Sequence, residues 1–129
     1  MKTQTLFDHL LIIVKNLERS IEFYNLLGFK HLETIQRPND NVGVVQLDNF
    51  KIELMCQREG AETYRTPRRT TDLGFRHIGL RVKDVEKEYE RLKDLINFDS
   101  PPITIEGRKG RITVFFKDPD GVEIHFVQN

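Results

Sequence analysis

The sequence predicts an α+β fold made of two tandem units, each with the element order β-α-β-β-β. Two observations carry this prediction. Residues 7–18 (FDHLLIIVKNLE) recur as residues 75–86 (FRHIGLRVKDVE), with five aligned positions identical and four conservatively replaced. Each copy is then followed by the same succession of a helical stripe and three strand-like runs. A long-period repeat of this kind is typical of paired units that each bury only part of their apolar surface.

The first unit opens with a strand near residues 7–14, which is apolar on both faces. Asn16 is suited to cap the helix that follows, because its side-chain oxygen can accept a bond from a free helical amide. Gly28 stands where a left-handed residue ends a helix. Strand-like runs follow at about 29–36, 42–48 and 50–56, and Asp48-Asn49 predicts a hairpin turn between the last two.

The second unit repeats this order. A strand at 76–82 leads to Asp84 as the helix cap, and strands are predicted near 102–106, 111–117 and 122–127. The segment Asp118-Pro119-Asp120-Gly121 has the proline and glycine of a type I turn. We therefore expect one domain over residues 1–129, with module one at about 5–57, a connecting segment at 58–74 and module two at about 75–129.

Composition limits the classes of partner. The chain has 129 residues, and its twenty Lys and Arg balance its twenty Asp and Glu, so we expect no nucleic-acid partner and no anionic membrane surface. No apolar run approaches the roughly 20 residues of a membrane span. Cys56 is the single cysteine and the start of the chain lacks an apolar signal core, which favours a reducing, cytoplasmic location.

Strand alternation places a small set of chemically active side chains on one predicted interior face. His9 and His77 occupy the same position of the repeat, and the neighbouring aliphatic side chains of each strand should meet the helix. Aligning the Asp48-Asn49 and Asp120-Gly121 turns places Glu53 on His125. The predicted interior set is His9, Glu53, His77 and His125.

Three imidazoles and a carboxylate from different strands are a donor set that suits a divalent first-row transition metal. The alternative is a hydrogen-bonded polar patch without a metal. Three of the four histidines in the chain fall at these positions, and two of them recur through the repeat, which favours the metal. The absence of a side chain at Gly79, beside His77, leaves room for a ligand.

Three segments are distinctive: DHLLIIVKNLERSIEFYNLLGF at 8–29, RHIGLRVKDVEKEYERLK at 76–93 and FFKDPDGVEIHF at 115–126. Through these segments the chain resembles the vicinal oxygen chelate superfamily, which groups glyoxalases, bleomycin resistance proteins and extradiol dioxygenases. The resemblance covers essentially the whole chain. It implies paired βαβββ modules that form an incomplete eight-stranded barrel or cleft around one divalent metal ion (Zn, Ni, Fe, Mn or Co). It also implies a homodimer as a candidate assembly.

The resemblance places three metal ligands on His9, Glu53 and His77, and the chain departs from the pattern at the fourth. Most metal-binding relatives have a glutamate where this chain has His125. We favour His125 as the ligand, with Glu123 as the alternative or as a partner of a ligand. Glu53 is then the candidate catalytic base.

Two arginines are weaker candidates for binding the substrate. Arg81 and Arg111 lie on strands of the second unit, and a guanidinium group can bind a carboxylate or phosphate through two parallel hydrogen bonds. The alternative is that both are ordinary surface arginines at strand ends. Glu123 is a third candidate for a contact with the substrate.

Three functions are compatible with these residues. The resemblance favours a glyoxalase-like lyase or isomerase that acts on a small oxygenated substrate through a metal-chelated enolate. An Fe(II) or Mn(II) dioxygenase of the extradiol type is the alternative, because His9, His77 and Glu53 supply two histidines and one carboxylate. A metal-free protein that sequesters a ligand, as resistance proteins do, is a third reading. The three interior histidines argue against it.

Overall fold

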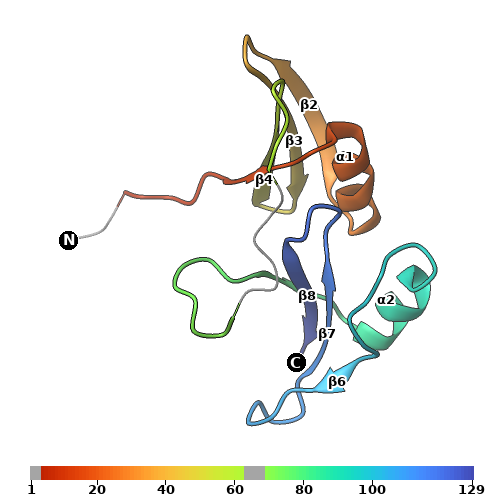
Figure 1. Ribbon diagram of the computed structural model, residues 1–129. Helices are drawn as coiled ribbons and strands as arrows, with labels where there is room; N and C mark the ends of the chain where they lie inside the picture. The colour runs from red at the N-terminus through yellow and green to blue at the C-terminus, as the bar shows by residue number, and fades with distance from the viewer. Residues whose placement is uncertain (1–3, 63–68) are drawn as a thin grey trace. The chain divides into compact units, whose positions relative to one another are not determined.

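A computed structural model describes residues 4–62 and 69–129 of the chain (Figure 1). The chain divides into two compact units, residues 1–62 and 63–129. Over the described residues each unit contains one four-stranded sheet and one α-helix, in the order β-α-β-β-β. The predicted α+β class with two tandem βαβββ modules is confirmed.

The sheet of the first module has the strand order β1-β4-β3-β2. β1 runs parallel to β4, whereas β3 is antiparallel to both β4 and β2. The helix of this module connects β1 to β2, where the antiparallel part of the sheet begins. Its elements are β1 (Leu10–Ile13), α1 (Leu17–Leu26), β2 (Lys30–Gln36), β3 (Asp40–Leu47) and β4 (Phe50–Gln57).

The helix ends of the first module follow the predicted chemistry. Asn16 accepts a hydrogen bond through Oδ1 from the backbone amide of Arg19 at 3.0 Å, which caps α1. Gly28 has a φ of 105°, and its amide donates to the carbonyl of Asn25 at 3.0 Å. Phe23 and Tyr24 on α1 are buried with the sheet residues of the module core.

The second module has the equivalent strand order, β5-β8-β7-β6, with β5 parallel to β8. Asp84 caps its helix by accepting from the amide of Lys87 at 3.1 Å. Asp118 Oδ1 accepts from the amides of Asp120 and Val122 at 2.9 Å each, which closes the predicted turn. The elements are β5 (Ile78–Arg81), α2 (Val85–Leu92), β6 (Ile103–Thr104), β7 (Ile112–Lys117) and β8 (Glu123–Gln128).

Three strands are shorter than the sequence predicts. β1 and β5 begin at Leu10 and Ile78, so His9 and His77 each lie one residue before a strand rather than within it. Within the described part of the chain, each of these strands pairs with one neighbour, over four residues. β6 has two residues instead of five, because Pro101 and Pro102 lack amide donors and the chain turns again after Ile105.

The two faces of each sheet differ as predicted. In β1, Ile12 is buried whereas Leu11 and Ile13 are 39% and 44% exposed. In β5, Ile78 and Leu80 are buried, while the intervening Gly79 is exposed. The aliphatic set therefore belongs to the core beside the helix, and the other face carries the candidate site. No helix among the described residues is long and apolar enough to cross a membrane.

Candidate metal centre

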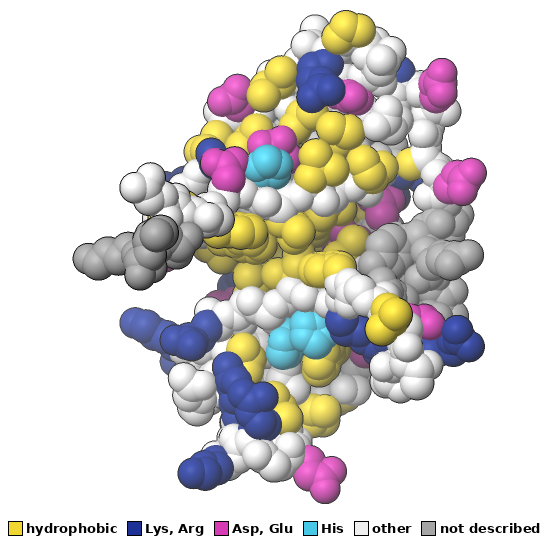
Figure 2. Space-filling view, turned by 90° about the vertical axis from the view of Figure 1, so that its left-hand side faces the viewer, with side chains coloured by type: hydrophobic (Ala, Val, Ile, Leu, Met, Phe, Trp, Pro, Cys, Tyr) yellow, Lys and Arg dark blue, Asp and Glu magenta, His cyan; other side chains and the backbone are white. Residues whose placement is uncertain are grey.

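The first module brings three possible ligands together at the start of β1. His9 Nδ1 lies 2.7 Å from Asp8 Oδ2 and 3.6 Å from Glu53 Oε2. One donor atom from each of the three residues lies within 4.8 Å of the others. Glu53 reaches this point from β4, where it pairs with Leu11 of β1. Figure 2 shows acidic side chains directly beside a histidine in this module.

Asp8 was missed as a site residue, although it stands directly before His9. Strand alternation would send neighbouring side chains to opposite faces, but β1 begins only at Leu10, so that rule does not apply here. The hydrogen bond with His9 lowers the pKa of Asp8, so the carboxylate is ionised at neutral pH. A carboxylate bonded to Nδ1 leaves Nε2 of His9 as the nitrogen available to a ligand.

The second module groups two histidines and a carboxylate. His77 Nδ1 lies 2.9 Å from Glu123 Oε2, and Arg76 Nε lies 3.5 Å from the same oxygen. The rings of His77 and His125 have centroids 4.5 Å apart. Glu123 is thus engaged by a histidine and an arginine. This arrangement supports its role as a partner of His77 rather than as the fourth donor.

His125 sits in a fixed ring environment. Phe115 stacks on it with centroids 4.6 Å apart and an angle of 12° between the planes. Gly79 pairs with it across β5 and β8, and a Cβ at that glycine would lie 2.9 Å from Nε2. Burial, and then the nearby charge of His77, lower the pKa of His125 to about 4. At neutral pH the imidazole is therefore uncharged, which is the form that binds metals.

This lowered pKa predicts that the metal-free protein loses stability as the pH falls from about 6.5 to about 4. In that window the unfolded chain binds a proton at His125 that the folded chain does not, so protonation favours unfolding. Urea unfolding at neutral pH and near pH 4.5 measures the free energy of unfolding. Its decrease between the two pH values should be smaller for His125→Asn than for the unchanged protein. An identical loss in both proteins would contradict the prediction.

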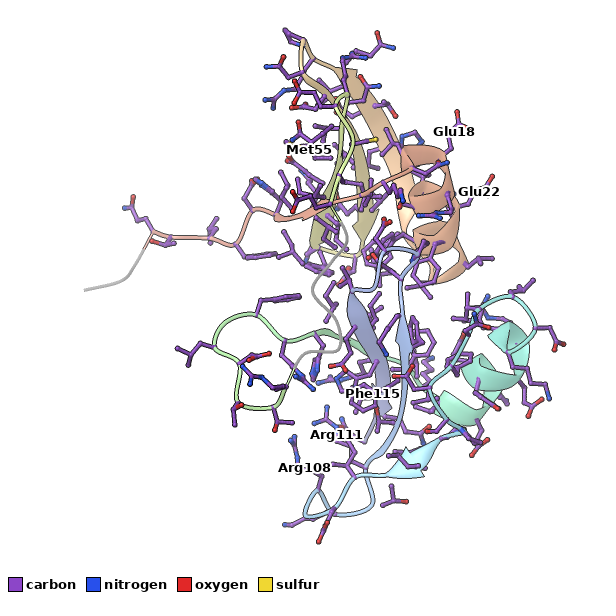
Figure 3. All side chains as sticks on the ribbon, in the orientation of Figure 1. Glu18, Glu22, Met55, Arg108, Arg111 and Phe115 are labelled. Carbon is purple, nitrogen blue, oxygen red and sulfur yellow. The ribbon has the colours of Figure 1, made fainter. Side chains whose placement is uncertain are left out.

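Arg111 lies where the second module could bind an anion. Its Nε atom is buried and has no hydrogen-bond partner among the described residues. Its positive charge is near enough to contribute to the lowered pKa of His125. Figure 3 shows Arg108 and Arg111 near the start of β7, on the side of the strands away from α2. Arg81 projects from β5 as an exposed side chain, two residues after Gly79.

Comparison with known proteins identifies the family. The model of the Glyoxalase/Bleomycin resistance protein/Dioxygenase superfamily matches residues 6–126. The chain belongs to this superfamily. It is 27% identical over 127 residues to a lactoylglutathione lyase of Haemophilus influenzae, which covers 94% of this chain and 90% of that protein.

Two further relatives support the same assignment to the glyoxalase superfamily. Lactoylglutathione lyase GLX1 of Arabidopsis thaliana is 29% identical over 130 residues, which cover 95% of this chain. The chain spans only 44% of the length of that protein. Among solved structures, a glyoxalase family protein from Enterococcus faecalis has a TM-score of 0.80 at 25% identity, with 96% of this chain and 98% of that chain covered.

The divalent metal that the superfamily resemblance implies can be tested against the donors present. Nitrogen and carboxylate donors are grouped in each module, as a borderline transition metal requires. The Nδ1 atoms of His9, His77 and His125 all lie within hydrogen-bond distance of a protein oxygen. Tying Nδ1 to an oxygen is how metal-binding histidines are commonly oriented, so the residues fit the metal.

Proposed function

We propose that the protein is a metal-dependent lyase or isomerase of the glyoxalase type that acts on a small oxygenated substrate. The observation that carries the proposal is the set of three histidines oriented through Nδ1, with the Glu53 carboxylate beside the first of them. Relatives named lactoylglutathione lyase, at 27% and 29% identity, support the same reaction class.

In this proposal the metal ligands are His9, Glu53, His77 and His125, and the divalent metal is one of Zn, Ni, Fe, Mn and Co. A bound metal would act as a Lewis acid toward a substrate oxygen. Asp8 and Glu123 would orient the imidazoles of His9 and His77 through the hydrogen bonds at 2.7 and 2.9 Å. Both carboxylates would also strengthen these nitrogen donors.

Glu53 is the residue that we propose to move the proton. Its side chain is 27% exposed, so it is held by the sheet and still accessible to a small molecule. As a carboxylate it can take a proton from a carbon next to a carbonyl group and return it to the neighbouring carbon. His125 stands where a second carboxylate is usual, so we assign this role to Glu53 alone.

The test is an assay of the purified protein after reconstitution with each of the five metals. The assay follows both the cleavage and the formation of lactoylglutathione. Elemental analysis measures the metal content. Turnover that requires a stoichiometric metal supports the proposal. Protein that takes up no transition metal would leave the ligand-sequestering function in its place.

The donor set also favours a second candidate, an extradiol-type dioxygenase. Two histidines and one carboxylate are the ligands of many non-haem Fe(II) oxygenases, and His9, His77 and Glu53 supply such a set. Because His125 replaces a second carboxylate, Glu53 is the one carboxylate among the four proposed ligands. Oxygen uptake with catechols by the Fe(II)-loaded protein, without lactoylglutathione turnover, would select this function.

We further propose that Arg111 binds an anionic group of the substrate, and we keep Arg81 and Glu123 as weaker candidates for contacts with the substrate. Arg111→Met should raise KM about 10- to 100-fold with little change in kcat, because a charge-assisted hydrogen bond contributes about 1.5–3 kcal/mol. Arg108→Met is the matched control, since Arg108 is exposed in the same turn. Steady-state kinetics measure both, and equal changes in KM would contradict the assignment.

A further inference from the structure

Thr113 is a buried polar residue that contacts His125, one of the proposed metal ligands. It lies on β7 with 1% of its surface exposed. Its Oγ1 atom is 2.7 Å from the carbonyl oxygen of Phe126 and 2.8 Å from Nδ1 of His125. Neither the sequence pattern nor the family comparison assigns any role to this threonine.

The two hydrogen bonds of Thr113 determine where the proton of His125 lies. A hydroxyl group has one proton to donate, and a carbonyl oxygen can only accept. The Thr113 hydroxyl therefore donates to Phe126 and must accept from His125. It follows that Nδ1 of His125 carries the proton and that Nε2 carries the lone pair.

We propose that Thr113 is a positioning residue that holds His125 in the Nδ1–H form and so presents Nε2 as a metal donor. The metal part rests on the proposed function, whereas the proton position does not. Phe115 stacks on one side of the ring, and the absence of a side chain at Gly79 allows Nε2 to lie where it does. Thr113 thus orients His125 through a hydrogen bond to Nδ1, as Asp8 and Glu123 orient His9 and His77, but with an uncharged group.

The direct test is NMR correlation of the imidazole nitrogens with their ring protons in metal-free protein at neutral pH. The chain has four histidines, and the signal lost in His125→Asn identifies His125. The unchanged protein and Thr113→Ser should show the Nδ1–H form. Thr113→Val offers no acceptor and should shift His125 toward the Nε2–H form. Because the first of these results needs no change at Thr113, a Thr113→Val protein that fails to fold does not weaken the test.

The second readout is the affinity for Zn²⁺, measured by competition with a chelator. Loss of a group that orients a ligand weakens metal binding about 10- to 100-fold, which is expected for Thr113→Val and not for Thr113→Ser. An Nε2–H form in the unchanged protein, or Thr113→Val with unaltered proton position and affinity, would overturn the inference. If the expected tautomers appear but no variant binds Zn²⁺, the positioning role stands and the proposed function fails.

Discussion

Glu53→Gln is expected to lower kcat by about 10²- to 10⁴-fold, the range that a positioned general base contributes. Glutamine keeps the shape of the side chain but cannot take up a proton and is a poorer metal ligand than a carboxylate. Glu53 is partly exposed on the open face of β4, so the substitution should leave the fold intact. Turnover of lactoylglutathione by metal-loaded protein measures the loss, and circular dichroism checks the fold.

Two controls separate this effect from a general loss of activity. Glu22→Gln makes the same chemical change at an exposed position of α1, where Figure 3 shows the side chain projecting from the helix. His31→Ala removes the one histidine outside the proposed site, which lies on exposed β2 and contacts Thr34 at 2.8 Å. Both should retain nearly full activity. A loss in either comparable to that of Glu53→Gln would remove Glu53 from its assigned role.

The repeat explains why so much of the fold could be predicted. It aligns His9 with His77 and, through the two turns, Glu53 with His125. The observed registers agree, because Glu53 pairs with Leu11 and His125 pairs with Gly79, the position equivalent to Leu11. Local signals were equally reliable at the helix caps, where a single side chain bonds to a nearby amide. A helix cap depends only on residues a few positions apart, so a local sequence pattern is enough to predict it.

The parts that escaped prediction depend on where strands begin and on how they pair, rather than on local sequence patterns. The start of β1 and β5 is decided by the length of pairing with β4 and β8, which no local pattern reveals. The hydrogen bond of Asp8 with His9 joins adjacent residues, but it forms only because the chain is not yet a strand before Leu10. Thr113 looked like an ordinary strand residue, and only the 2.8 Å contact with His125, twelve residues later, gives it a role.

Gly79→Ala is expected to weaken Zn²⁺ binding by more than the roughly 10- to 100-fold that follows loss of an orienting partner, because it displaces a proposed ligand itself. The added Cβ would lie 2.9 Å from Nε2 of His125, too close to be tolerated without movement. The imidazole can move away from Gly79 without moving the backbone, but it then gives up its stacking on Phe115 and its hydrogen bond with Thr113. The free energy of unfolding should therefore fall less than after a substitution in the core, while chelator competition shows the loss of affinity.

Gly43→Ala is the matched control, because the same steric conflict falls in the core instead of the site. Its Cβ would lie 2.9 Å from Leu17 Cδ1 and 3.0 Å from Ile21 Cδ1, where β3 packs against α1. Extra volume in a packed core lowers stability by about 1–3 kcal/mol, which urea unfolding would detect. Zn²⁺ affinity should be unchanged in this variant. If both glycine variants lose stability and affinity together, the open face of β5 does not act as a site separable from the fold.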